Sequence, residues 1–421
     1  MPGLLDQIVL HDFLVQDLEL FTQPCRQRIL IVTDGLLNFS PTDGFGLSRV
    51  VAALRTYSPQ PIITLAHRNA ANHNVTIAGV VFAVIGNFNF ASAAVTVSTA
   101  NYDQVWLFGF KSGPSTSGPG NVHPLTGPEI NRLGTFMNHG GGVFATGDHA
   151  NLGQGMGGEL PRIRRMREWL SVPMGTEGNA SARDRIDTVV DPGPGGLYEF
   201  DDQADSIPQR IYPNYRVTWT PTWTATIHPL LKMPGAPVNR TNASGFTNDM
   251  DVLPDHPHES ICREVSAAVN APQLAATYNA HGLNFQEFPN AASGTGRIGS
   301  EIVAFGVSGG RSVNNSGVWK PPVNPRMFGL ISAFDGHAAQ AYPSAPTRPG
   351  RIVCDSTWHH YVNVNIDGGQ TGRTGLGAIV AGNWIPNAAG QKVFQYYRNI
   401  IAYLIPLNRR NCWLFIDLLA V

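Results

Sequence analysis

The chain has 421 residues, 43% of them hydrophobic, which is enough to form the core of one large domain or two ordinary ones. Only 14% of the residues are charged and the formal net charge is −1, so no basic field is present that would attract nucleic acid or an anionic membrane surface. No apolar run approaches the ~18 residues that a membrane span needs, so we expect no membrane span. A surface with so little charge opposes self-association weakly, so we expect a homo-oligomer.

The N-terminal segment, residues 1–27, scatters acidic residues among apolar ones. It lacks the basic start and the continuous apolar stretch of a secretory signal, and it predicts an amphipathic helix. The chain has four cysteines, Cys25, Cys262, Cys354 and Cys412, far apart and without CxxC spacing. This spacing indicates neither a zinc site nor a disulfide scaffold. Together these features predict a cytoplasmic protein with reduced thiols.

Short apolar runs alternate with amphipathic segments over residues 28–170, which predicts βαβ units and a parallel sheet. One helix start is well marked, because Thr126 can cap it, Pro128 lies in its first turn and Glu129 occupies the capping-box position. The predicted strands span 28–33, 61–65, 80–85, 104–108 and 143–147, and the predicted helices span 46–56, 126–139 and 160–170.

The pattern changes in residues 171–260, which are rich in Pro, Gly, Asn and Thr. They predict an irregular insertion with a few short strands, which could serve as a lid. Because residues 28–170 supply too few strands to cover their own core, we expect residues 261–421 to complete the same α/β domain. The later predicted strands span 273–278, 301–307, 328–334 and 351–354, and a last helix spans 388–405.

Two strand-end motifs, GGVFATGDH (141–149) and RIVCDSTWHH (351–360), suggest where a site lies. Each begins as a buried strand and stops on Asp and His. In open α/β sheets, ligands bind beyond the carboxyl ends of the strands. We therefore expect the polar side chains of the two motifs to meet in a catalytic site. These candidates are Asp148, His149, Asp355, His359 and His360.

Carboxylates and imidazoles can act as acids and bases or as metal ligands. Asp355 could orient an imidazole. Neighbouring residues of an extended chain point to opposite faces, so we expect one of His359 and His360 at the cleft and the other packed. The alternative is structural: Asp148 would cap the next segment, and the histidines would be buried and satisfied by backbone groups.

Further candidates follow the same logic. Asp34 ends the first strand, Asp335 and His337 follow the strand at 328–334, and Trp358 lies in the second motif; these four are expected to bind substrate. For Asp34 a simple turn role is nearly as well supported. His256 and His258 are spaced i, i+2, which suits a divalent metal but is also common in solvated loops. A divalent metal is the only cofactor that the sequence suggests.

The order of the elements resembles the class I glutamine amidotransferase-like superfamily, especially its ThuA-like (trehalose-utilisation) branch. The matching stretches cover about half of the chain and are RILIVTDG (28–35), QVWLFGF (104–110), the helix with GGGVFATGDH (126–149) and GRIVCDSTWHH (350–360). The resemblance implies a flavodoxin-like, mostly parallel sheet flanked by helices, and a catalytic histidine after the last strand. Amidotransferases carry a nucleophilic Cys at the turn that here reads Thr146-Gly147-Asp148-His149, so neither glutaminase activity nor thiol chemistry is expected.

The expected function is acid–base or metal-assisted hydrolysis, or proton transfer, on a small polar molecule, with a carbohydrate-like substrate fitting best. The alternatives are a non-catalytic, self-assembling structural protein and a small-ligand-binding protein that uses the same cleft without turnover. The expected partners are therefore a small-molecule substrate and other copies of the chain, without nucleic acid or membrane.

Overall fold

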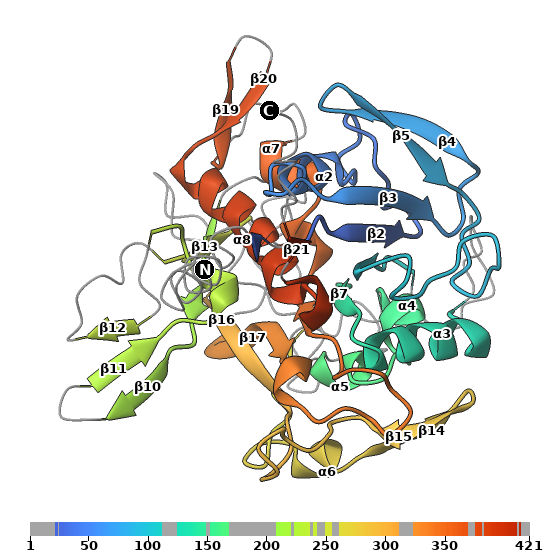
Figure 1. Ribbon diagram of the computed structural model, residues 1–421. Helices are drawn as coiled ribbons and strands as arrows, with labels where there is room; N and C mark the ends of the chain where they lie inside the picture. Colours follow the sequence, from blue (N-terminus) through green and yellow to red (C-terminus); the bar gives the residue numbers. More distant parts are fainter. Residues whose placement is uncertain are drawn as a thin grey trace, which may run out of the picture.

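A ten-stranded sheet forms the centre of the computed structural model (Figure 1). In order across the sheet, its strands are β4 (His73–Ile77), β5 (Val80–Ile85), β3 (Ile62–His67), β2 (Arg28–Thr33), β6 (Gln104–Phe108), β7 (Gly142–Thr146), β18 (Ile352–Asp355), β17 (Val323–Phe334), β16 (Ser300–Gly310) and β9 (Tyr212–Pro213). The structure describes residues 22–23, 25–111, 124–148, 152–167, 208–219, 223–235, 239–241, 249–254, 261–310, 323–368, 375–380, 383–410 and 412–413.

The middle of the sheet, from β5 to β18, is parallel, and the strands beyond it on both sides are antiparallel. This confirms the predicted α/β class with a mostly parallel sheet. Numbered along the chain, the parallel strands lie in the order 3-2-1-4-5-6, the order of doubly wound dinucleotide-binding sheets. The flavodoxin order is 2-1-3-4-5, so the flavodoxin-like part of the prediction is not confirmed. The order reverses between β2 and β6, which is where such sheets bind ligands.

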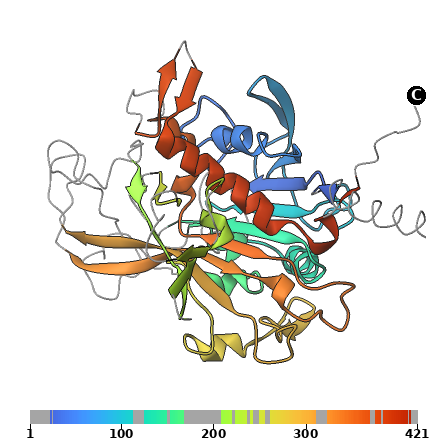
Figure 2. The ribbon, with the colours of Figure 1, turned by 60° about the vertical axis from the view of Figure 1, so that its left-hand side comes forward.

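Helices cover both faces of the sheet (Figure 2). Alternate residues of each strand point to opposite faces. On β2, Ile29 and Ile31 pack in the core beneath α2 (Ser48–Leu54) and α8 (Ala388–Leu404). Leu30 and Val32 of the same strand pack on the other side. The helices on that side are α3 (Gly127–Asn138), α4 (Gln154–Gly157) and α5 (Ile163–Met166).

The start of α3 is fixed as the sequence predicts. The buried carboxylate of Glu129 accepts hydrogen bonds from the backbone N–H and the hydroxyl of Thr126, at 2.9 and 3.0 Å. Glu129 also accepts from the N–H of Phe90 and pairs with Arg68, both across the loop edge of the sheet. The helix cap therefore also ties α3 to the segments that follow β3 and β5.

The remaining described elements are small. The strands are β1 (Thr22–Gln23), β8 (Gln209–Arg210), β10 (Arg216–Trp219), β11 (Trp223–Thr226), β12 (Asn239–Thr241), β13 (Val252–Leu253), β14 (Thr277–Ala280), β15 (Leu283–Gln286), β19 (Gly377–Val380), β20 (Asn383–Pro386) and β21 (Cys412–Trp413). The helices are α6 (Ala271–Leu274), α7 (Asn363–Asp367) and the 3-10 turns η1 (Pro229–Leu231), η3 (Gly336–Ala338), η4 (Trp358–His360) and η6 (Leu407–Arg409).

Two predicted elements are wrong in detail. The strand predicted at 273–278 is a helical turn, α6, followed by β14, because Asn270 adopts a left-handed conformation (φ 57°) and Pro272 begins a turn of helix. The helix predicted at 160–170 begins late, at Ile163, because Arg162 has φ 66°. The residues after Arg167 lie outside the described part of the chain.

Parts of the predicted insertion pack into the domain, whereas β10, β11 and β12 form a separate three-stranded sheet. Strand β9 pairs with β16 and extends the main sheet. Turn η1 packs against α8, where the side-chain amide of Asn399 donates to the carbonyl oxygens of Leu230 and Lys232 at 3.0 and 2.8 Å. These segments therefore belong to the core, and the predicted lid concerns residues that the structure does not describe.

The two ends of the described chain meet. Strand β1 pairs with β21, and the backbone N–H of Cys25 donates to the carbonyl oxygen of Arg409. Cys25 is disulfide-bonded, so the prediction of reduced thiols is wrong for this residue. The spacing of cysteines along the sequence could not reveal it, because the pairing of the chain ends brings distant residues together. The predicted helix over 1–27 falls mostly on residues that the structure does not describe.

Within the described ranges, no helix has the length and the apolar character needed to cross a membrane.

Candidate functional site

The two strand-end motifs meet at the carboxyl edge of the sheet. Strands β7 and β18 are parallel neighbours, with Asp355 in register with Thr146, so the residues that follow them lie side by side. The imidazole Nε2 of His359 lies 3.5 Å from Oδ2 of Asp148, and both side chains are fully buried. The structure thus places Asp148 beside His359, one of the two histidines expected near it, whereas His149, which we expected in the same pocket, lies outside the described residues.

The orientation of His359 is fixed from its other side. Its Nδ1 lies 2.9 Å from Oδ1 of Asn365. An amide oxygen only accepts hydrogen bonds, so this contact is made by a proton on Nδ1 and leaves Nε2 facing Asp148. Asp148 is held in turn by the hydroxyl of Thr357, which donates to its Oδ1 at 2.7 Å. His359 Nε2 and one oxygen of Asp148 thus face each other, so that a proton carried by either group lies between the two.

His360 belongs to a second cluster. Its Nδ1 donates to Oδ1 of Asp355 at 2.7 Å. The other oxygen of Asp355 accepts from the hydroxyls of Tyr361 and Tyr396, at 2.7 and 3.0 Å. Burial raises the pKa of both tyrosines well above the usual value, so they stay protonated donors. A carboxylate with so many donors is held firmly, which suits Asp355 for positioning η4, and with it His359, rather than for proton transfer.

The division between the two histidines agrees with the prediction that one faces the site and the other packs, but its cause differs. They lie in the 3-10 turn η4 and not in an extended strand. Successive side chains of such a turn also diverge, by about a third of a turn.

A buried arginine supports the backbone behind the site. Arg167, 1% exposed, donates from Nη2 to the carbonyl oxygens of Asp148 and Ser356, at 2.8 and 2.7 Å. It therefore joins the two motifs directly. The turn that it braces has no room for a side chain at Gly147, because an added Cβ would lie 2.4 Å from the carbonyl oxygen of Leu152. This close packing explains the glycine in the TGDH turn.

The neighbouring strand ends of β2 and β6 carry buried polar atoms without a described partner. Oδ1 of Asp34 accepts from the N–H groups of Phe110 and Lys111, at 2.6 and 3.0 Å, but its buried Oδ2 has no hydrogen-bond partner among the described residues. Burial raises the pKa of Asp34. The indole Nε1 of Trp358, a buried donor, also has no hydrogen-bond partner among the described residues. Unsatisfied buried polar atoms are uncommon and indicate an unseen water, ion or ligand.

These atoms adjoin the histidine. The Trp358 ring lies 5.5 Å from that of Phe110 and 4.1 Å from that of His359, measured between centroids. A chain of contacts therefore connects Asp34, through Phe110 and Trp358, with His359. Arg68 approaches from β3, and the buried Nε and Nη1 of its guanidinium also have no partner in the described part of the chain.

The other predicted residues are not brought to this site. Strand β17 is antiparallel to β18, so the prediction that its carboxyl end lies beside those of β7 and β18 is wrong. Asp335 instead pairs with Arg351 at the opposite edge, at 2.7 Å, and His337 lies beside Arg410. Their predicted substrate contacts are therefore not supported. Three predicted residues lie outside the described ranges: His149, His256 and His258.

No group of three or more His, Cys, Asp or Glu in the described ranges is arranged to hold a metal. Cys354 lies fully buried in β18, and burial raises its pKa to about 12, which agrees with the expected lack of thiol reactivity. Its neighbour Cys262 is also buried, and the Cys262 thiol donates to the carbonyl oxygen of Cys354 at 3.4 Å.

Sequence reasoning missed several residues of the site. Thr357 and Asn365 flank the second motif, and their small polar side chains gave no signal by themselves. Arg68 directly follows the observed strand β3 but lies three residues beyond the end of the predicted strand, so the prediction did not single it out. Arg167 lies in the helix predicted at 160–170, where a charged side chain is usually solvated, and only the tertiary structure shows that it is buried.

No protein-family model matches the chain, and no match was found among curated proteins. The resemblance to the amidotransferase-like superfamily accordingly stays a prediction.

Proposed function

We propose that the protein is an enzyme that carries out hydrolysis or proton transfer on a small polar substrate, with Asp148 and His359 as the proton-transferring pair. One observation carries the proposal. Two motifs more than two hundred residues apart place a carboxylate and the basic nitrogen of an oriented imidazole 3.5 Å apart, beyond the carboxyl ends of parallel strands. A gap of this length is compatible with a catalytic contact that tightens when substrate binds.

The roles follow from the contacts. His359 would act as general base through Nε2, because Asn365 holds its other nitrogen as a donor. Asp148 would stabilise the imidazolium that forms, or pass on its proton. The unpartnered atoms of Asp34 and Trp358 would hold the substrate, one as acceptor and one as donor. Asp355 and His360 would position the turn.

A small-ligand-binding protein without turnover is the second candidate. It is favoured by the same unpartnered atoms at the switch point, which would bind a polar ligand whether or not chemistry follows. The two proposals differ in what Asp148 and His359 do, and the experiment below separates them.

The test measures turnover of p-nitrophenyl acetate, p-nitrophenyl phosphate and a set of p-nitrophenyl glycosides. We expect hydrolysis of at least one by the wild-type chain. Asp148→Asn, which keeps an oxygen for Thr357, and His359→Gln should each lower turnover by about 10²–10⁴-fold, as loss of a general acid–base group does. His281→Gln, at an exposed turn on the other side of the sheet, is the control. Equal turnover in wild type and Asp148→Asn would remove this pair from the mechanism and leave the binding protein.

Three further features stand as proposals. Self-association is supported by the hairpin β19–β20, where Ile379, Val380 and Ile385 are at least half exposed. A divalent metal at His256 and His258 rests on their spacing alone. The disulfide at Cys25 argues against the proposed cytoplasmic location, because disulfides persist mainly in oxidising compartments.

A further inference from the structure

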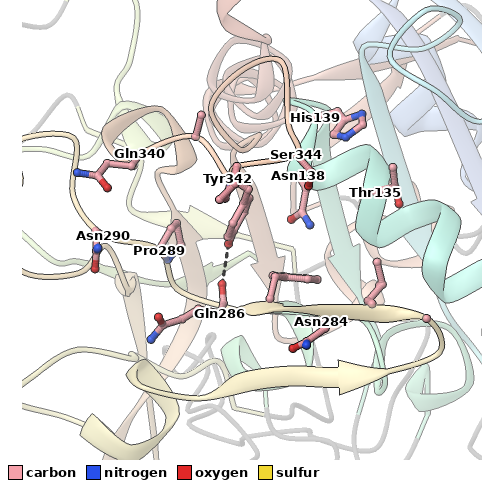
Figure 3. Close-up of a pocket in the computed structure, with 15 residues that line it drawn as sticks. Thr135, Asn138, His139, Asn284, Gln286, Pro289, Asn290, Gln340, Tyr342 and Ser344 are labelled. Atoms are coloured by element: carbon pink, nitrogen blue, oxygen red, sulfur yellow. Dashed lines mark hydrogen bonds between the residues drawn. The ribbon is translucent and has the colours of Figure 1, made fainter.

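A second site lies at the other end of the sheet. A pocket of about 720 Å³ is enclosed by the last turn of α3, the hairpin β14–β15 and the loop at 340–344 (Figure 3). The last turn of α3 leads into the amino end of β7, whereas Asp148 follows its carboxyl end. The two sites are therefore separated by at least the length of a five-residue strand, roughly 16 Å. The volume lies in the range of small-molecule sites, about 300–1,000 Å³.

The lining is polar but uncharged. None of the residues around the pocket is Asp, Glu, Lys or Arg. It is instead rich in side-chain amides, which present both donors and acceptors. These are Asn138, Asn284, Gln286, Asn290 and Gln340. A charged ligand would lose its hydration here without touching an opposite charge in the lining itself, whereas hydroxyl groups, which both donate and accept, would find partners of both kinds.

The wall behind these amides is rigid. Arg162, fully buried, donates from Nη2 to Oδ1 of Asn138 at 2.8 Å and from Nη1 to the hydroxyl of Tyr342 at 3.0 Å. The Tyr342 hydroxyl donates onward to the carbonyl oxygen of Gln286 at 2.8 Å, the bond drawn in Figure 3. With its oxygen occupied, Asn138 is left with its N–H donors for a ligand. Arg162 therefore links all three walls of the pocket.

The surroundings hold Arg162 in an unusual conformation. Its φ of 66° is a conformation that residues other than glycine seldom adopt. Its backbone N–H donates to the buried carboxylate of Glu287 at 2.9 Å, and its guanidinium lies 5.3 Å from the centre of the Phe285 ring. A strained, fully supported residue behind a polar pocket keeps the amides in place before a ligand arrives, which lowers the entropy cost of binding.

Two aromatic rings complete the lining. Phe285 and Tyr342 meet edge to face, with centroids 5.3 Å apart. Because Tyr278 and Arg162 cover the faces of Phe285, the two rings present their edges to the pocket, and the amides are the groups that match the hydroxyls of a sugar. We propose that this pocket binds an uncharged carbohydrate of one or two rings. The proposal does not depend on the chemistry at Asp148.

The test is saturation-transfer NMR and calorimetric titration of the full chain with glucose, N-acetylglucosamine, maltose and cellobiose, and with glucose 6-phosphate and glucuronate as charged counterparts. We expect at least one neutral sugar to bind at millimolar concentration, and the charged sugars to bind more weakly. Gln340→Ala and Asn284→Thr should each weaken binding by about fivefold or more, as the loss of one hydrogen bond does.

The hairpin supplies a matched control. Asn279 faces Asn284 across β14–β15 in register but does not line the pocket, so Asn279→Thr should leave binding unchanged. Asp148→Asn should also leave it unchanged, which distinguishes this site from the proposed catalytic one. The inference is overturned if none of the neutral sugars binds, if the charged sugars bind equally well, or if Asn284→Thr and Gln340→Ala bind like the wild type.

Discussion

At the scale of single residues, the sequence predicted which side chains matter better than it predicted their roles. The positions of Asp148 and His359 followed from one rule, that ligands lie at the carboxyl ends of parallel strands. Their partners did not follow, because Thr357 and Asn365 become significant only when η4 and α7 fold back on the motif. Asp335 and His337 were misplaced because the same rule was applied to a strand whose direction the sequence does not reveal.

Asp34 provides a prediction that separates function from stability. Burial raises its pKa, so the folded state holds its proton more tightly than the unfolded state does. Stability from this group is present below the unfolded value near 3.8 and is lost as pH rises through the folded value. The amide in Asp34→Asn does not ionise, so the variant does not lose this stability as the pH rises. It keeps an oxygen for the N–H groups of Phe110 and Lys111. We expect a higher urea midpoint than wild type at pH 7 and no gain at pH 3.

If Asp34 also binds the substrate, the same variant should be more stable and less active. A variant less stable than wild type at pH 7 would show that the charged carboxylate is favoured in the fold, through Arg68 or an ion, and the stability argument would fail. Unfolding in urea, followed by circular dichroism at both pH values, distinguishes these outcomes.

At the scale of elements, periodicity located the strands closely, and β2, β5 and β6 have the predicted bounds. The direction of each strand relative to its neighbours was harder to predict. An apolar run has the same pattern whether it is parallel or antiparallel to its neighbour. The connection after β16 contains the clue, because residues 311–322 show no helical pattern, and a parallel crossover normally needs a helix. Connection length and helical content are therefore better guides to strand direction than the strands themselves.

The capping residue Glu129 joins three elements, which makes it a sensitive test of the fold. Glu129→Ala would remove the acceptor for Thr126 and leave Arg68, whose side chain is 7% exposed, as a buried charge without its carboxylate. Breaking such a pair costs about 3–5 kcal/mol. We expect a loss of that size in the free energy of unfolding, measured with urea, and a smaller loss for Glu129→Gln, which keeps an acceptor.

Arg132→Ala, on the same helix, is the control and should change stability by less than about 0.5 kcal/mol. Equal effects of Glu129→Ala and Arg132→Ala would mean that the cap and the ion pair contribute little, and that α3 is held by its apolar face alone.

At the scale of the whole molecule, the sheet separates two polar regions. The switch point between β2 and β6 and the ends of β7 and β18 define one edge, where buried acids and histidines meet. The uncharged pocket lies at the other edge. The sequence predicted the first region from its motifs. It could not predict the second, because the amides of that pocket come from three separate segments and none of them forms a motif.

Histidines that are buried in separate parts of the fold make the stability of the whole fold sensitive to acid. Burial lowers the pKa of His67 to about 4 and that of His228 and His337 to about 3. The charged Arg216 beside His228 and Arg351 beside His337 act in the same direction. The folded state therefore binds fewer protons than the unfolded state between pH 6.5 and about 4, so stability is complete above pH 6.5 and falls as the pH is lowered.

With three such groups, the free energy of unfolding changes by up to about 4 kcal/mol per pH unit near pH 5, because each group contributes up to about 1.36 kcal/mol per pH unit. This is a large part of the ~5–15 kcal/mol that a typical fold possesses, so we expect cooperative unfolding well above the pH at which carboxylates titrate. The free energy of unfolding, measured with urea at pH 8, 6 and 5, should already be lower at pH 6 than at pH 8, because histidines of the unfolded chain titrate near pH 6.5, and should fall more steeply between pH 6 and pH 5. His228→Asn, which can still accept from the N–H of Leu230, should reduce the slope by about a third. An unchanged slope in this variant would mean that His228 is protonated in the folded protein, and that burial of this histidine does not limit acid stability.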